Sequence, residues 1–302
     1  MFRNYPLFLI AALLLLSPDQ SRGQGCSDAG FCTLNSFKPD AGTPAAANQI
    51  KIGGSFGGAD NAISVVGGYL EYNRQFGDKF GLDAKLTALG QSGNDISAFG
   101  LSDLYVNANL SPRSDLHFTL GAKIPLADGN AANDNLPLPM DYQASLGTFD
   151  LIVGAGYDIG KLQLVVALQQ PLTQNKNAFF AEDYPAGSPL RDIQTTNMFQ
   201  RSGDVLLRVS YPFQLGQKLT LTPSLLPIYH LANDKFTDKQ GNEIEIDGSQ
   251  GLTFNGNLYF DYAISASSAL QLNAGLPFVV RDARPDGLTR SFVANLEYRF
   301  KF

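Results

Sequence analysis

The last eleven residues of the chain alternate between apolar and polar side chains. One face of this segment carries Phe292, Ala294, Leu296, Tyr298, Phe300 and Phe302. The other face carries Asn295, Glu297, Arg299 and Lys301. Successive side chains of a β-strand point to opposite faces, so the segment is predicted to be a strand with one apolar and one polar face.

The same alternation begins near residue 50 and recurs to the end of the chain, where it predicts about twelve strands. These strands are expected near 50–57, 64–76, 80–90, 101–110, 115–124, 148–157, 161–170, 204–213, 217–230, 252–264, 268–278 and 291–302. Helical periodicity of 3.6 residues is not evident in this part of the sequence. The chain is therefore predicted to be all-β.

The connections between these strands alternate in length. Short ones are expected at 77–79, 111–114, 158–160, 214–217 and 265–267, and a compact one at 58–63. Longer ones are expected at 91–100, 125–147, 171–203, 231–251 and 279–290. An even number of strands with short turns at one end and long loops at the other is typical of outer-membrane barrels. We therefore predict a closed antiparallel transmembrane β-barrel with both termini in the periplasm.

Composition excludes several other classes of protein. Hydrophobic residues make up 44%, aromatic residues 11% and charged residues 17% of the 302 residues, which a disordered chain would not combine. The one long apolar run, Leu7–Leu16, is about half the length that a membrane-spanning helix needs. With 22 basic against 28 acidic residues, the chain offers no basic surface for nucleic acid. A soluble β-sandwich is the remaining alternative to a barrel.

The N-terminus has the features of a secretory signal. Arg3 precedes the apolar run, Pro18 follows it, and the small residues Ser21 and Gly23 mark a cleavage site before Gln24. An uncleaved anchor is the alternative interpretation. Three regions are therefore expected: a signal peptide (1–23), a periplasmic segment or plug (24–49) and a transmembrane barrel (50–302).

Both cysteines follow the predicted cleavage site. Cys26 and Cys32 are five residues apart in an exported chain, so we expect them to form one small disulfide loop. A metal site would require further Cys or His ligands nearby. Lipidation of Cys26 is a second alternative, but Gly23 stands where a lipoprotein signal has a large aliphatic residue.

The ending Tyr298-x-Phe300-x-Phe302 resembles the C-terminal strand signal of Gram-negative outer-membrane barrels. That resemblance implies insertion into outer-membrane lipid by the barrel insertion machinery. An aromatic girdle at one membrane boundary fits the same arrangement, because amphipathic rings prefer that depth. Its expected members are Phe76, Phe80, Tyr157, Tyr211, Phe213, Tyr262, Tyr298 and Phe300.

The polar face of the predicted strands defines the expected lining of the barrel. We expect these lumen residues to be Glu71, Asp83, Lys85, Asn107, Asn109, Lys123, Gln163, Arg208, Lys218, Asn255, Asn257, Asp261, Gln271, Asn273, Glu297 and Arg299. Because both signs of charge occur, no strong ion preference is predicted. A lining of this kind suits a channel for small solutes. The alternative is a closed barrel that binds partners through its long loops.

No catalytic, cofactor or metal site is predicted. Of the two histidines, His117 faces inward and His230 ends a strand without a nucleophile close in sequence. The glycines of 154–160 lie in a hairpin and not in a dinucleotide loop, because a strand follows them. The acidic residues of 234–247 do not have the spacing of a calcium loop.

Three segments resemble a family of transporter-like outer-membrane barrels associated with the meta-pathway of phenol degradation and related to long-chain fatty-acid transporters. They are 99–109, with Gly100-x-x-Asp103; 116–129, with Lys123-x-Pro125; and 142–157, with Gln143-x-x-x-Gly147. The resemblance implies passive uptake of small hydrophobic or aromatic molecules. It transfers no catalytic or ligand-binding residue to this chain.

Overall fold

The computed structural model describes residues 34–39, 47–287 and 290–302. The predicted signal peptide and the Cys26–Cys32 disulfide lie outside these residues. Among the described residues, no helix is both long enough and apolar enough to cross a membrane.

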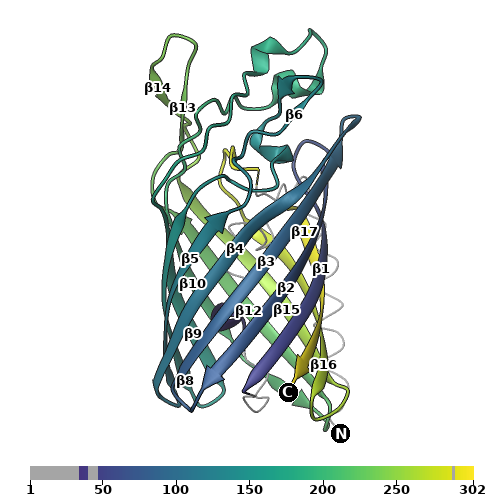
Figure 1. Ribbon diagram of the computed structural model, residues 1–302, viewed down its shortest axis with the longest axis vertical. Coiled ribbons are helices and arrows are strands. Elements are labelled where there is room, and N and C mark those ends of the chain that lie inside the picture. The colour runs from purple at the N-terminus through teal and green to yellow at the C-terminus, as the bar shows by residue number, and fades with distance from the viewer. Residues whose placement is uncertain (1–33, 40–46, 288–289) are drawn as a thin grey trace, which may run out of the picture.

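Twelve antiparallel strands form the wall of a barrel (Figure 1). They are β1 (Asn48–Gly58), β2 (Ser64–Phe76), β3 (Phe80–Gly93), β4 (Ile96–Arg113), β5 (Leu116–Pro125), β8 (Asp150–Ile159), β9 (Leu162–Pro171), β10 (Asp204–Ser210), β12 (Leu219–His230), β15 (Gly251–Ala263), β16 (Ser268–Val279) and β17 (Phe292–Lys301). Each strand pairs with its neighbours in chain order, and β11 (Phe213–Leu215) continues the line of β10 along β12.

The first and last strands close the barrel. β1 pairs with β17 in register, with Ile50 opposite Phe300 and Gly58 opposite Phe292. Closure satisfies the backbone hydrogen bonds of both terminal strands and leaves no open edge, as a β-structure in lipid requires. The predicted fold class, a closed twelve-stranded barrel, is thereby confirmed.

Short and long connections lie at opposite ends of the barrel (Figure 1). The turn end carries the connections 77–79, 114–115, 160–161, 216–218 and 264–267, together with the C-terminus. The loop end carries 59–63, 94–95, 126–149, 172–203, 231–250 and 280–291. The loops contain the short pieces β6 (Ala132–Asn133), β7 (Leu136–Pro137), β13 (Lys235–Thr237), β14 (Glu243–Glu245), η3 (Met140–Tyr142), η4 (Ala181–Asp183) and η5 (Pro189–Asp192).

One predicted loop is wrong. Residues 91–100 do not form a long connection, because β3 and β4 continue toward each other and leave a two-residue turn. Asn94 and Asp95 occupy that turn with φ values of 53° and 60°. Asn and Asp tolerate this left-handed conformation better than most residues, which favours a tight hairpin at the pair.

The outer surface of the barrel is apolar. On β2 and β17 alone, Val66, Leu70, Phe292 and Leu296 are between 44% and 57% exposed. The eight girdle aromatics expected from the sequence are all exposed. Seven lie on strand segments near the turn end, and Tyr211 lies in the break between β10 and β11. An apolar outer band on a closed antiparallel barrel is the signature of a transmembrane β-barrel of the outer-membrane type.

Candidate functional site

The interior of the barrel carries a group of buried and partly buried charges, which we call the charged cluster. Its members are Lys38, Lys51, Lys85, Arg299, Glu71, Asp83, Asp261 and Glu297. Lys51 Nζ lies 3.1 Å from Glu71 Oε1, and Arg299 Nη1 lies 3.0 Å from Asp261 Oδ1. Such pairing offsets the cost of removing charges from bulk water.

A second part of the interior is apolar. Tyr105, Ile152, Ala167, Leu206 and Leu226 point inward from five different strands and form one buried group, the apolar patch. Val165 and Ile228 pack against its margin. Inward positions of a solute channel are normally polar. The apolar patch therefore distinguishes this interior from a plain aqueous pore.

The short N-terminal segment 34–39 lies inside the barrel, at mid-height in Figure 1, and contains η2 (Asn35–Phe37). Leu34 and Phe37 are each 1% exposed and belong to the same buried group as the apolar patch. On its other side, Lys38 Nζ lies 2.7 Å from Glu297 Oε2, and Lys51 donates a hydrogen bond to Asn35 Oδ1. The segment thus contacts both the apolar patch and the charged cluster.

Backbone glycines make room for two of the aromatic rings inside the barrel. A Cβ at Gly154 on β8 would overlap the Phe37 ring, and a Cβ at Gly53 on β1 would overlap the Tyr69 ring. Tyr69 in turn donates a hydrogen bond to Glu297. Gly154 therefore allows Phe37 to lie directly against the barrel wall.

Some buried polar side chains of the interior have no hydrogen-bond partner among the described residues. The amide groups of Asn107 and Asn257 make no side-chain hydrogen bond with the described residues. Thr222 Oγ1 is likewise buried and unbonded within the described part of the chain. Buried polar groups are normally hydrogen-bonded to protein or water. Because Asn107 lies on β4 and Asn257 and Thr222 lie on β15 and β12 across the barrel, the arrangement favours water in the interior between these walls.

The predicted lumen residues are distributed as follows. Twelve are buried on the barrel strands: Glu71, Asp83, Lys85, Asn107, Lys123, Arg208, Asn255, Asn257, Asp261, Gln271, Asn273 and Glu297. Asn109, Gln163 and Arg299 are partly buried and line a cavity of about 560 Å³ near the turn end. Lys218 is the exception, because it lies in the exposed turn 216–218, outside β12.

Several interior residues are absent from the sequence-based set. Lys51 alternates with Ile50 and Ile52, so the period of two by itself places it inward. Tyr105 also faces inward, but it is apolar and a polar lining pattern does not indicate it. The positions of Leu34 and Phe37 depend on tertiary contacts, and the surrounding sequence contains no periodic signal for them.

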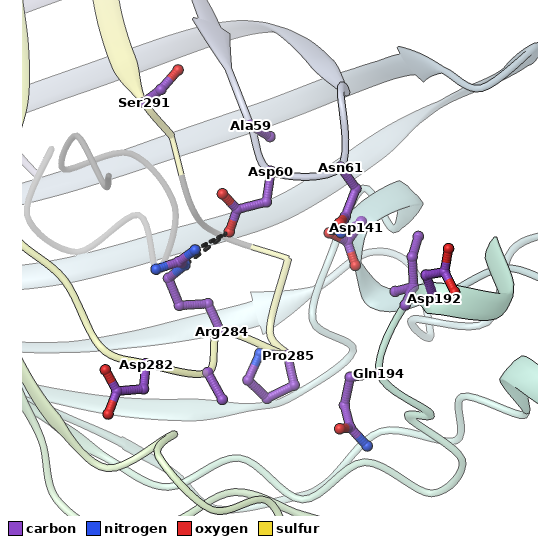
Figure 2. Close-up of a pocket in the computed structure, with 12 residues that line it drawn as sticks. Ala59, Asp60, Asn61, Asp141, Asp192, Gln194, Asp282, Arg284, Pro285 and Ser291 are labelled. Carbon is purple, nitrogen blue, oxygen red and sulfur yellow. Dashed lines mark hydrogen bonds and ion pairs between the residues drawn. The ribbon is translucent and has the colours of Figure 1, made fainter. Parts of the chain in front are cut away.

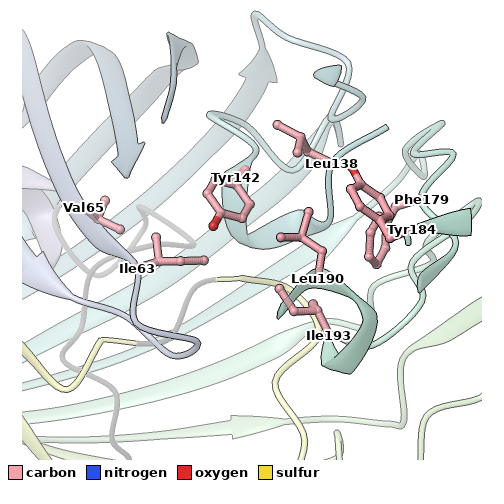
Figure 3. Close-up of a cluster of buried hydrophobic side chains, with 8 residues drawn as sticks. All are labelled: Ile63, Val65, Leu138, Tyr142, Phe179, Tyr184, Leu190 and Ile193. Carbon is pink, nitrogen blue, oxygen red and sulfur yellow. The ribbon is translucent and has the colours of Figure 1, made fainter. Parts of the chain in front are cut away.

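The loops at the loop end fold over the barrel around their own apolar cluster (Figure 3). Its members are Ile63, Val65, Leu138, Tyr142, Phe179, Tyr184, Leu190 and Ile193. They come from the β1–β2 connection and the start of β2 and from the loops 126–149 and 172–203. The loops are therefore packed together, and the apolar cluster holds them against the barrel rim.

A buried charge network joins three loops beneath this cover. His230 at the end of β12 lies between two carboxylates, with Nδ1 2.7 Å from Asp204 and Nε2 2.8 Å from Asp234. Arg201 contacts Asp204 from the loop 172–203. From the loop 280–291, Arg281 lies 2.8 Å from Asp286 and 3.8 Å from Asp234. These ion pairs fix the loops relative to the barrel mouth.

A cavity of about 600 Å³ lies among the loops (Figure 2). It is lined by Ala59, Asp60, Asn61, Asp141, Asp192, Ile193, Gln194, Asp282, Ala283, Arg284, Pro285 and Ser291. Arg284 Nη2 lies 2.8 Å from Asp60 Oδ2. Burial raises the pKa of Asp141 to about 6, although Asn61 donates a hydrogen bond to its carboxyl group.

The turn-end cavity contains a serine, a histidine and an aspartate in contact. Ser111 Oγ lies 2.9 Å from His117 Nδ1, and His117 Nε2 lies 3.5 Å from Asp158 Oδ2. The β4–β5 hairpin brings Ser111 to His117, a partner that the sequence analysis missed. Acyl transfer also needs N–H donors for an oxyanion. Here the Ser111 N–H donates to Lys79 and the next residue is Pro112, so the adjacent backbone offers none.

The described residues include no group of three or more His, Cys, Asp or Glu side chains arranged to hold a metal ion. Two acidic residues of the loop 231–250 are instead engaged in other contacts. Asp234 belongs to the charge network, and Asp238 accepts hydrogen bonds from Asn242 and Gln240 within its own turn.

No protein-family profile and no curated protein sequence matches the chain. Solved structures with a similar fold include the KdgM porin (8% identity, TM-score 0.43, covering 84% of this chain and 99% of that chain). The CymD monoaromatic hydrocarbon channel is similar at 10% identity and a TM-score of 0.47, covering 93% of this chain and 94% of that chain. The outer membrane phospholipase A from Escherichia coli is similar at 9% identity and a TM-score of 0.38, covering 86% of this chain and 95% of that chain. These values carry no inference about activity, and the fold rests on the strand pairing described above.

Proposed function

We propose that this protein is an outer-membrane channel for the passive passage of small solutes, with the segment 34–39 as a plug inside it. The observation that carries the proposal is a polar interior, with buried amide groups that have no partner among the described residues, a cavity near each end, and the segment 34–39 lining the cavity at the turn end. The apolar patch supports solutes with a hydrophobic or aromatic part. Catalysis is not part of the proposal, because the Ser111–His117 pair has no neighbouring oxyanion donor from Ser111 or Pro112.

The alternative is a closed barrel that binds a partner through its loops. The packed apolar cluster of the loop end favours this alternative, since a folded cover is a stable platform. If this alternative holds, the ion pairs of the charged cluster serve only to close the interior.

Single-channel conductance in planar bilayers separates the two functions. We compare the mature protein with a variant lacking 24–47, and the heat-dependent gel mobility of each confirms that the barrel has folded. A channel gives salt-dependent current steps that are larger or more frequent in the deletion variant. Silence from both folded proteins would overturn the channel and favour the closed barrel.

A further inference from the structure

We propose that His230 is a proton-operated latch for the loops that cover the barrel mouth. The protonated ring holds the loops 172–203 and 231–250 together, and loss of its proton releases them. The inference goes beyond the proposed channel function, and only its effect on current rests on that function.

Both nitrogens of the His230 ring face a carboxylate. Nδ1 lies 2.7 Å from Asp204 Oδ1, and Nε2 lies 2.8 Å from Asp234 Oδ1. An imidazolium ring has an N–H on each nitrogen and donates to both carboxylates. A neutral ring has a single N–H, so its bare nitrogen stands against a carboxylate oxygen with no proton between them. The charged ring is therefore the form that fits between two ionised carboxylates.

The charges around His230 balance only when its ring is charged. Two guanidinium groups and three carboxylates form one network with the ring, and all six side chains are at most 6% exposed: Arg201, Asp204, His230, Asp234, Arg281 and Asp286. Of the two strands beside the ring, β10 contributes Asp204 and β15 presents Gly251, which adds no charge. A neutral ring therefore leaves one buried negative charge without a counter-charge.

Asp234 connects the charge of the ring to the two loops. It belongs to the loop 231–250, and its Oδ1 also accepts a hydrogen bond from the Ser202 N–H of the loop 172–203. Its own N–H donates to Ser249 Oγ, near the other end of its loop. Loss of the ring proton thus replaces an attraction by a repulsion at the point where the two loops meet.

A small apolar group lies beside the latch. Its buried members come from the loops 126–149, 172–203 and 231–250: Met140, Leu146, Phe199 and Ile246. The Ile246 N–H donates to the Asp234 carbonyl oxygen, which joins this group to the latch. Phe236 on β13 packs against the group from the loop 231–250. The environment of residue 236 therefore reports whether this loop is held.

The test measures release of the loop 231–250 in folded protein in detergent. The chain has no tryptophan, so Phe236→Trp provides a single fluorescent reporter. Every protein also carries Asp141→Asn, because burial raises the pKa of Asp141 to about 6 and its titration would overlap that of a histidine. Acrylamide quenching of the reporter is compared at about pH 5.5 and about pH 9, on either side of the usual range of histidine. We expect the quenching constant of this reference protein to rise at least about threefold.

Two variants of the reference protein separate the ring from its charge. His230→Gln has no charge at either pH, so strong quenching is expected at both. In Asp204→Asn the new amide donates to Nδ1 of a neutral ring, and Nε2 keeps its N–H for Asp234. Two arginines then face two carboxylates without help from the ring. Weak quenching of Asp204→Asn is therefore expected at both pH values.

Each contrary result overturns the latch. Equal quenching of the reference protein at the two pH values shows that no group releases the loop. A rise in Asp204→Asn equal to that of the reference protein shows that the contact between His230 and Asp234 does not control release. Weak quenching of His230→Gln at both pH values shows that the loop is held without the ring. Heat-dependent gel mobility confirms that each barrel has folded.

Bilayer recordings at the same two pH values separate the latch from the channel. They use the variant lacking 24–47, so that the plug does not mask the loops, and larger or more frequent current steps are expected at about pH 9. A protein that releases its loop in detergent and is silent in the bilayer refutes the channel and leaves the latch standing. A conducting protein whose loop stays held at both pH values refutes only the latch.

Discussion

Lys38 and Glu297 form a part-buried ion pair with 2.7 Å between Nζ and Oε2, although they are 259 positions apart in the chain. Glu297 is on the last strand, and the closure of β17 onto β1 places it on the same interior wall as Lys51. The pair therefore connects the N-terminal segment to the seam of the barrel. Any movement of the segment out of the interior must break this contact.

Enlarging Gly154 should displace the plug without altering it. In Gly154→Ala the new Cβ overlaps the Phe37 ring, and relieving such an overlap costs about 1–3 kcal/mol, so we expect the open fraction to rise roughly tenfold. Gly156→Ala is the matched control on the same strand and face, because its nearest neighbour would be 3.7 Å away. Single-channel recording measures both variants. Identical currents from the two variants would contradict the prediction.

Replacement of His230 should destabilise the loop end. His230→Gln removes a ring that bridges Asp204 and Asp234, and breaking a buried ion pair costs about 3 kcal/mol. The chain has two histidines, so His117→Gln is the natural control. The His117 side chain is 39% exposed, and its replacement should change stability by less than about 0.5 kcal/mol. Proteolysis of the loops and thermal unfolding compare the two variants. Equal effects of His230→Gln and His117→Gln would refute the role of the buried charge network in holding the loops.

Asp141 should make the loop end less stable as the pH rises. Burial raises its pKa from 3.8 to about 6, so the folded state binds this proton more tightly than the unfolded state does. The contribution of this proton to the free energy of unfolding is therefore fully present below about pH 4 and is lost as the pH rises through about 6. Its size is about 3 kcal/mol. Asp141→Asn should lose this part of the pH dependence. Thermal unfolding between pH 4 and 7.5 measures it, and parallel curves for the two proteins would disprove the assignment.

Ser111 should not behave as a catalytic nucleophile. Its hydroxyl contacts His117, but the Ser111 N–H is bonded to Lys79 and Pro112 has no N–H to offer an oxyanion. A fluorophosphonate probe should therefore leave the folded protein unlabelled, and Ser111→Ala should have the conductance of the wild type. Stoichiometric labelling that Ser111→Ala abolishes would overturn this expectation.

The alternating pattern of the sequence already determined the barrel strands and the two faces of its wall. A pleated strand places consecutive side chains on opposite sides of the sheet. The apolar residues that flank Asn107 and Glu297 in the sequence therefore face lipid once the sheet has closed. The same local rule placed Lys51 inward. It failed at Lys218, because the strand expected from residue 217 begins two residues later, at Leu219. It also failed at Asn94–Asp95, where turn geometry extended two strands.

Only the tertiary structure decided how the interior is filled. Periodicity shows which way a side chain points but not which distant residue it meets, so the pairing of Lys38 with Glu297 followed from barrel closure. The segment 34–39 has no repeating pattern, and its place depends on the apolar patch that five separate strands build together. The fold of the wall is thus encoded locally by the pleat of each strand, whereas the plug site arises from contacts between residues that are far apart in the chain.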